Sequence, residues 1–149
     1  MKKNVIVSLA DSNYFELLDE LINSITRFEE SKNIAICILD AGLTEDQKTI
    51  LSKKVDQIKP AEWDISVSQF KVKGKEWLKS QVSRAFLPKY FPDYEKFLWI
   101  DCDAWVQEWS AIELYFKACE DGKLGITQTM APGYRIMSKV KWLFGKLAI

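Results

Sequence analysis

The chain of 149 residues contains no histidine. Within this chain, a Ser-His-Asp or Cys-His catalytic site, a histidine general base and a histidine-ligated zinc site are therefore excluded. The three cysteines are odd in number and have no CxxC spacing, which favours a reduced, cytosolic setting over a disulfide framework. No segment approaches the roughly 20 consecutive apolar residues that a membrane-spanning helix needs.

Glycine is also scarce, with only six in the chain. The loop that follows the first predicted strand runs from Ala10 to Tyr14 and has none, so the GxGxxG loop of dinucleotide-binding folds is missing. The GxxxxGK[ST] loop of P-loop proteins is missing as well. A bound phosphate would therefore have to be neutralised by a metal ion and basic side chains.

The composition, with 48% apolar and 28% charged residues, is that of one ordinary globular domain over residues 1–149. The net charge is zero and no dense basic stripe is present, so we expect no nucleic-acid partner. Residues 122–149 nevertheless carry five basic side chains and no acidic one. This basic and aromatic tail fits either a solvated segment or a peripheral membrane contact, and both interpretations stay open.

Apolar periodicity divides the chain into alternating strands and helices. It predicts buried strands at 4–9, 34–39, 65–70 and 97–100, with a fifth at 124–127. Helices are expected at 14–28, 44–55, 75–87, where Pro88 marks the end, and 111–119. This alternation predicts an α/β fold with a mainly parallel sheet flanked by helices. Residues 130–149 show no clear periodicity and form a poorly defined tail.

Two aspartates, Asp101 and Asp103, follow the apolar run Phe97 to Ile100. Ionised carboxylates are costly to desolvate, so a pair at the end of a buried strand usually holds a cation or a strong donor. Oxygen ligands of this kind suit Mg²⁺ or Mn²⁺, which in turn neutralise phosphates. The alternative is an aspartate pair that only shapes the following turn. Cys102 should point away from its two neighbours and pack as a buried thiol.

Polar residues follow three of the predicted strands: Asp11 with Asn13, Asp40, and the Asp101–Asp103 pair. In parallel sheets ligands bind at the carboxyl ends of strands, so these residues are candidates for a common site. Asp11 and Asn13 are also suited to cap the helix that follows them. Asp40 is better explained as a turn residue.

Three sequence blocks resemble the family 8 retaining glycosyltransferases: Ser8 to Tyr14, Ile38 to Glu45, and Ser83 to Pro88 followed by Tyr94 to Val106. The resemblance implies a GT-A fold, a UDP-linked sugar donor, and Mn²⁺ (or Mg²⁺) bound by the DxD motif at Asp101 and Asp103. The implied reaction transfers a hexose, glucose or galactose, to a glycan or lipopolysaccharide-type acceptor with loss of UDP. From the cysteines and the basic tail, we expect a cytoplasmic localisation, with the inner face of the membrane as an alternative.

Carried over residue by residue, the resemblance gives Asp11 and Asn13 a contact with the nucleoside. Arg84, 17 residues before Asp101, would reach the diphosphate or the sugar of the donor. Asp101 would hold both ribose and metal, and Asp103 the metal.

One departure from the family pattern concerns the third metal ligand, which is a histidine in a C-terminal motif of the family. Because this chain has no histidine, we expect it to be the N-terminal, donor-binding half of the fold, with the C-terminal part missing. The alternatives are a non-catalytic nucleotide- or metal-binding module and an interaction domain. An uncovered sheet edge in such a half would favour self-association into a homo-oligomer.

Overall fold

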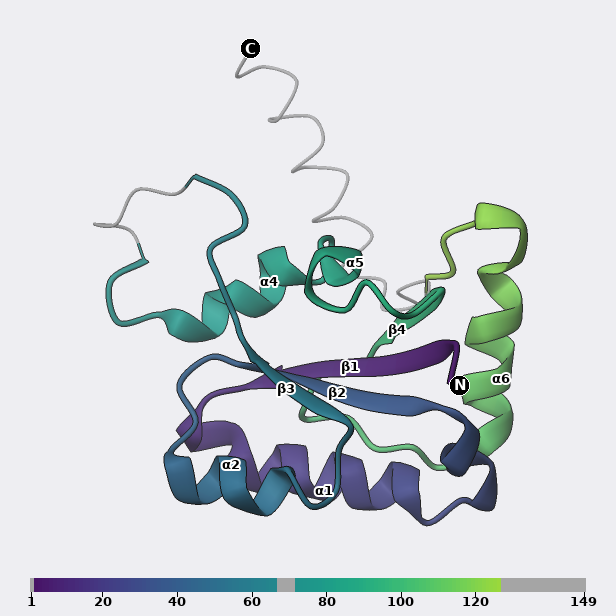
Figure 1. Cartoon of the computed structure of the whole chain (residues 1–149), viewed down its shortest axis with the longest axis horizontal. Coiled ribbons are helices and arrows are strands. Elements are labelled where there is room, and N and C mark those ends of the chain that lie inside the picture. The colour runs from purple at the N-terminus through teal and green to yellow at the C-terminus, as the bar shows by residue number, and fades with distance from the viewer. Residues whose placement is uncertain (1, 67–71, 127–149) are drawn as a thin grey trace, which may run out of the picture.

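The computed structural model describes residues 2–66 and 72–126. Its centre is a four-stranded sheet in the order β3-β2-β1-β4, and every neighbouring pair is parallel (Figure 1). The strands are β1 (Asn4–Ala10), β2 (Ala35–Asp40), β3 (Gln57–Pro60) and β4 (Lys96–Trp99). The predicted α/β fold with a parallel sheet is therefore confirmed.

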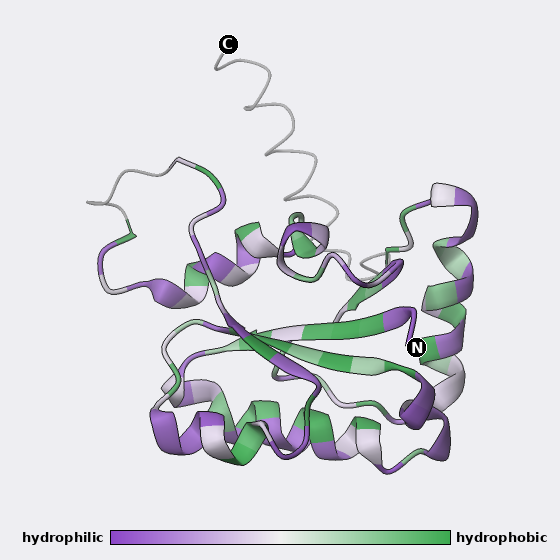
Figure 2. Cartoon of the chain, in the orientation of Figure 1, coloured by the Kyte–Doolittle hydropathy of each residue, from purple (hydrophilic) through white to green (hydrophobic). Residues whose placement is uncertain are grey.

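The two central strands are apolar along almost their whole length because both of their faces are covered (Figure 2). One face packs against α1 (Phe15–Thr26), α2 (Glu45–Leu51) and α6 (Trp109–Ala118). The opposite face packs against α5 (Leu87–Tyr90), which follows the short α4 (Lys79–Ser83). Single-turn 3₁₀ segments lie at Ser12–Tyr14 (η1), Glu29–Asn33 (η2), Glu76–Leu78 (η3) and Glu120–Gly122 (η4). None of the described helices is long and apolar enough to cross a membrane.

The register of the sheet aligns the carboxyl ends of three strands. Ala10 of β1 lies opposite Asp40 of β2, and Val7 of β1 lies opposite Trp99 of β4. The polar residues that follow these strands therefore emerge at one edge of the sheet, as the sequence predicts.

The helix starts follow the expected capping chemistry in part. Thr44 and Gln47 form a capping box at the start of α2. Of the two residues suited to cap the first helix, Asn13 does not act as a cap. Asp11 caps η1 instead, and α1 begins only at Phe15.

Three predicted elements are wrong in the described residues. Ile65 and Ser66 are not in a strand, while 67–70 lie outside the described residues; the third strand is Gln57–Pro60. The predicted helix at 75–87 is broken into η3 and α4, and Pro88 lies in the first turn of α5 instead of ending a helix. A proline fits there because first-turn N–H groups have no partner within the helix.

The predicted fifth strand is also absent from the described residues, since 124–126 have no regular secondary structure and Thr127 lies outside them. The tail at 130–149 is likewise outside the described residues. β4 is accordingly an edge strand of the described sheet.

The segment that follows the aspartate pair is fixed to α1 by side-chain hydrogen bonds. The fully buried Ser24 hydroxyl accepts from the N–H of Val106 at 3.0 Å and donates to the carbonyl of Leu21 at 2.7 Å. Arg27 Nη2 donates to the carbonyls of Val106 and Gln107 at 2.9 and 2.8 Å. These bonds position the backbone a few residues beyond Asp103.

Ser24→Ala is expected to destabilise the protein by about 1–3 kcal/mol, because it leaves the buried Val106 N–H without a partner. Urea denaturation gives the free energy of unfolding that checks this value. The matched control is Ser52→Ala, whose hydroxyl donates to the carbonyl of Thr49 on the surface and has no other hydrogen bond among residues 2–66 and 72–126. A loss no larger than that of the control would show that the Ser24–Val106 bond does not hold the segment.

Candidate functional site

A pocket of about 360 Å³ lies at the carboxyl edge of the sheet. The end of β1, the start of α4 and the residues after β4 all contribute to its wall. It brings together four of the predicted site residues: Asp11, Asn13, Asp101 and Asp103. The fifth, Arg84, lies outside this pocket but lines an adjoining groove of about 1320 Å³ with Asp101 and Asp103.

Asp40, the remaining polar strand end, does not line either cavity. Its Oδ1 accepts from the N–H groups of Gly42 and Leu43, both at 2.7 Å. Gly42 has a φ of +131°, a conformation that side chains strongly disfavour. The interpretation of Asp40 as a turn residue is confirmed.

Asp11 has a structural role that leaves part of its carboxylate available. Its Oδ1 accepts from the N–H groups of Asn13 and Tyr14 at 2.9 and 3.2 Å and so caps η1. Within the described residues, its second oxygen and the exposed amide of Asn13 make no hydrogen bond. Capping therefore fixes the loop, and the free groups can contact a ligand in the pocket.

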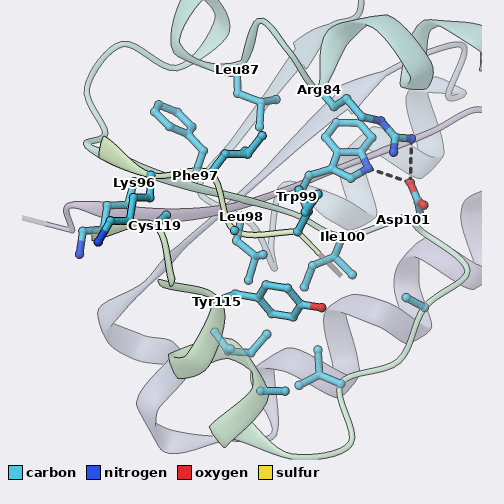
Figure 3. A pocket seen from close by; sticks show the side chains of 18 of the residues that line it. Arg84, Leu87, Lys96, Phe97, Leu98, Trp99, Ile100, Asp101, Tyr115 and Cys119 are labelled. Carbon is cyan, nitrogen blue, oxygen red and sulfur yellow. Dashed lines mark hydrogen bonds and ion pairs between the residues drawn. The ribbon is translucent and has the colours of Figure 1, made fainter. Parts of the chain in front are cut away.

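Asp101 accepts two hydrogen bonds on one oxygen (Figure 3). Trp99 Nε1 donates to Oδ1 at 2.7 Å, and Arg84 Nη2 approaches the same atom at 3.2 Å. Arg84 is held in turn by a bond from Nε to the carbonyl of Ser80 at 2.9 Å. Its guanidinium carbon lies 5.1 Å from the centre of the Trp99 ring. Asp101 Oδ2 remains free among the described residues.

Asp103 is exposed and makes no hydrogen bond or ion pair within the described residues. Between the two aspartates, Cys102 packs against the core as predicted, but it is only half-buried and also lines the smaller pocket beside its neighbours. Burial, together with the negative charges of Asp103, Asp101 and Asp11, raises the pKa of the Cys102 thiol to about 11. The three carboxylates and the thiol line the same pocket at the strand ends.

The residues present fit a divalent cation in part. No group of three or more Asp, Glu, Cys or His side chains in the described residues is arranged to hold a metal ion. Two carboxylates that share a pocket, each with at least one uncommitted oxygen, nevertheless match how Mg²⁺ is usually held, with substrate phosphates and water completing the ligand set. The pair is suited to an ion that arrives with a nucleotide.

Sequence reasoning missed two features of the site. The first is the hydrogen bond from the Trp99 indole N–H to Asp101. The alternation of strand residues places positions 99 and 101 on one face and could have suggested this contact. The second is a pair of exposed aromatic rings in the smaller pocket, Tyr14 (46% exposed) and Trp77 (49%). No periodicity distinguishes such rings from core residues.

The fold at this site is also found in solved structures of LgtC. An active-site mutant of LgtC matches with 23% identity and a TM-score of 0.55, over 74% of this chain and 41% of the LgtC chain. The galactosyltransferase LgtC in complex with donor and acceptor sugar analogues matches with 20% identity and a TM-score of 0.53, over 72% and 41%. At these identities the likeness shows a shared fold.

A comparison with curated proteins gives no match. The family model described as Glycosyl transferase family 8 matches residues 5–122, which include both aspartates, Arg84 and the loop at Asp11. The chain spans 41% of the length of the LgtC chains that share its fold. Because the family model covers most of the sequence, the chain belongs to glycosyl transferase family 8.

Proposed function

We propose that this chain is the donor-binding part of a retaining hexosyltransferase that uses a UDP-sugar. It would transfer glucose or galactose to a glycan or a lipopolysaccharide-type acceptor, with release of UDP. The observation that carries the proposal is the pocket in which Asp11, Asn13, Asp101 and Asp103 meet, with Arg84 bonded to Asp101 at its border. Family membership and the fold shared with a galactosyltransferase support it.

The nucleoside would bind at the end of β1. Asp11 Oδ2 can accept a hydrogen bond from the base, and the Asn13 amide offers both a donor and an acceptor. The exposed rings of Tyr14 and Trp77 line the same pocket and offer flat apolar surfaces. Stacking of a base on such a ring contributes about 1–3 kcal/mol.

The diphosphate would lie over the aspartate pair. Asp101 and Asp103 are the residues that would hold Mn²⁺ or Mg²⁺ between the protein and the phosphates. When bound, the ion acts as a Lewis acid that stabilises the charge developing on the departing UDP. Asp101 would also accept a hydrogen bond from the ribose, as the family resemblance implies.

Arg84 supplies the second positive charge of the site. Its guanidinium can donate two parallel hydrogen bonds to a phosphate, which a lysine cannot do. In this structure, Nη2 of Arg84 is bonded to Asp101, and its Nε donates to the carbonyl of Ser80. A phosphate that enters the site offers a more highly charged partner within reach of the same guanidinium.

A second candidate function is a nucleotide- or metal-binding module without catalysis. It is favoured by the metal site, which offers two carboxylates but no third protein ligand among the described residues. Turnover of UDP-glucose or UDP-galactose to UDP separates the two: release of UDP supports the enzyme, and metal-dependent binding without release supports the module.

Three further expectations remain proposals. The acceptor would be a glycan or a lipid-linked sugar reached in the cytoplasm or at the inner face of the membrane. Peripheral membrane contact rests on the basic residues within 122–149. Homo-oligomer formation rests on β4 as an edge strand of the described sheet, with an apolar groove along it.

Arg84→Gln is expected to weaken binding of UDP in the presence of Mn²⁺ by about tenfold or more, because a charged hydrogen bond to phosphate contributes roughly 1.5–3 kcal/mol. Isothermal titration calorimetry measures this change. The matched control is Lys117→Gln on α6, which removes an exposed cation outside both cavities. Equal affinities for the two variants would argue against a diphosphate at Arg84.

A further inference from the structure

We infer that Trp99 is a positioning residue for the metal ligand Asp101, an inference that rests on the proposed function. The indole N–H donates to Asp101 Oδ1 at 2.7 Å, the shortest contact that this carboxylate makes in the described structure. Trp99 does not line the smaller pocket and would not touch the nucleotide there. Its effect would be exerted through the orientation of one carboxylate.

The Trp99 ring is fixed by its surroundings. It is half-buried and packs against the core cluster that covers the α5 face of the sheet. The guanidinium of Arg84 lies over the ring with its carbon 5.1 Å from the ring centre (Figure 3). The core on one side and the guanidinium on the other hold the indole N–H in place. The N–H in turn fixes the orientation of the Asp101 carboxylate that accepts from it.

The two oxygens of the Asp101 carboxylate have different hydrogen-bonding environments. Oδ1 is occupied by two N–H donors, from Trp99 and Arg84, which fill its usual accepting capacity. Oδ2 makes no bond in the described residues and is left as the oxygen that can bind a cation. The hydrogen bonds thus select one oxygen for the metal.

Trp99 and Arg84 should respond differently when a UDP-sugar binds. Arg84 can turn toward a phosphate and leave Oδ1 with a single partner. The indole N–H is neutral and is not attracted to the phosphate, and the ring stays packed against the core cluster on the α5 face. The N–H therefore keeps its hydrogen bond to Asp101. Trp99 therefore holds the carboxylate during the step in which Arg84 is engaged elsewhere.

The test is Trp99→Phe, which keeps an apolar ring in the core and removes the N–H donor. Groups that hydrogen-bond to metal ligands typically contribute 10–100-fold to metal affinity. The affinity for Mn²⁺ at saturating UDP, measured by electron paramagnetic resonance of free Mn²⁺, should fall by at least about tenfold. UDP binding without metal and the thermal midpoint should change little.

The matched control is Trp105→Phe, which makes the same chemical change at a half-exposed indole whose nitrogen carries no hydrogen bond within the described residues. If Trp99→Phe does not fold, Trp99→Leu supplies the same test, since its side chain is apolar and has no hydrogen-bond donor. Unchanged Mn²⁺ affinity in the folded Trp99 variant would overturn the inference and leave the proposed function standing. Absence of Mn²⁺-dependent UDP binding in the unmodified chain would overturn both.

Discussion

Asp103→Asn is expected to abolish the part of UDP binding that depends on Mn²⁺, lowering the affinity by at least about 100-fold. Loss of a group that only hydrogen-bonds to a metal ligand lowers metal affinity 10–100-fold, and loss of the charged ligand itself should lower it further. Asp103 is well suited to the test because its side chain is exposed and has no partner among the described residues. Calorimetric titration of UDP with and without Mn²⁺ gives the affinities.

The same variant should leave the fold intact. Surface substitutions away from caps and buried bonds usually change stability by less than about 0.5 kcal/mol. Asp93→Asn is the matched control, because it makes the same substitution at an exposed turn outside both cavities. Equal Mn²⁺-dependent UDP binding by both variants would remove Asp103 from the metal site.

Phe91→Ala is expected to lower the free energy of unfolding by about 3–5 kcal/mol, a large share of the total for a domain of this size. The Phe91 side chain is fully buried directly after α5, in the cluster that covers one face of the sheet. Truncation would leave a cavity beneath the elements that carry Arg84. The thermal midpoint should fall by about 10 °C, and scanning calorimetry measures it.

The control for this prediction is Leu114→Ala, which removes an apolar side chain that is 66% exposed on α6. It should change stability by less than about 1 kcal/mol, since little buried surface is lost. A similar, small effect for both variants would show that the α5 face of the sheet contributes little to the fold.

The central part of the fold is readable from sequence because it rests on strong apolar patterns. β1 and β2 are covered on both faces, so they appear as continuous apolar runs between turn residues. β3 escaped detection because it has only four residues, Gln57–Pro60, half-buried or exposed, with a lysine and a proline among them. Its place in the sheet comes from pairing with β2, which no local pattern encodes.

The broken helix around Arg84 could not be predicted for a related reason. Residues 75–87 have helical periodicity, but the chain turns between Arg84 and Phe86 to bring Leu87, Tyr90 and Phe91 onto the sheet. Tertiary burial of these side chains overrides local propensity. The break places Arg84 at the end of α4, from which it reaches Asp101.

The residues of the candidate site were predicted from the sequence, but the hydrogen bonds between them were not. Sequence placed Asp11, Asn13, Asp101 and Asp103 at strand ends, and their shared pocket follows from the parallel register. Which oxygen of Asp101 is occupied, and by which donors, depends on side-chain packing around Trp99. The expectation that the metal binds to Oδ2 rests on this difference between the two oxygens of Asp101.

The most direct test of the account is anomalous scattering from crystals of the chain that contain Mn²⁺ and UDP. We expect a single Mn²⁺ peak contacted by Asp103 and by Oδ2 of Asp101, with the UDP phosphates as its other ligands. The uracil ring should lie beside Asp11 and Asn13. A Mn²⁺–UDP complex bound elsewhere, or UDP bound at this pocket with no metal between the phosphates and the two aspartates, would contradict the account.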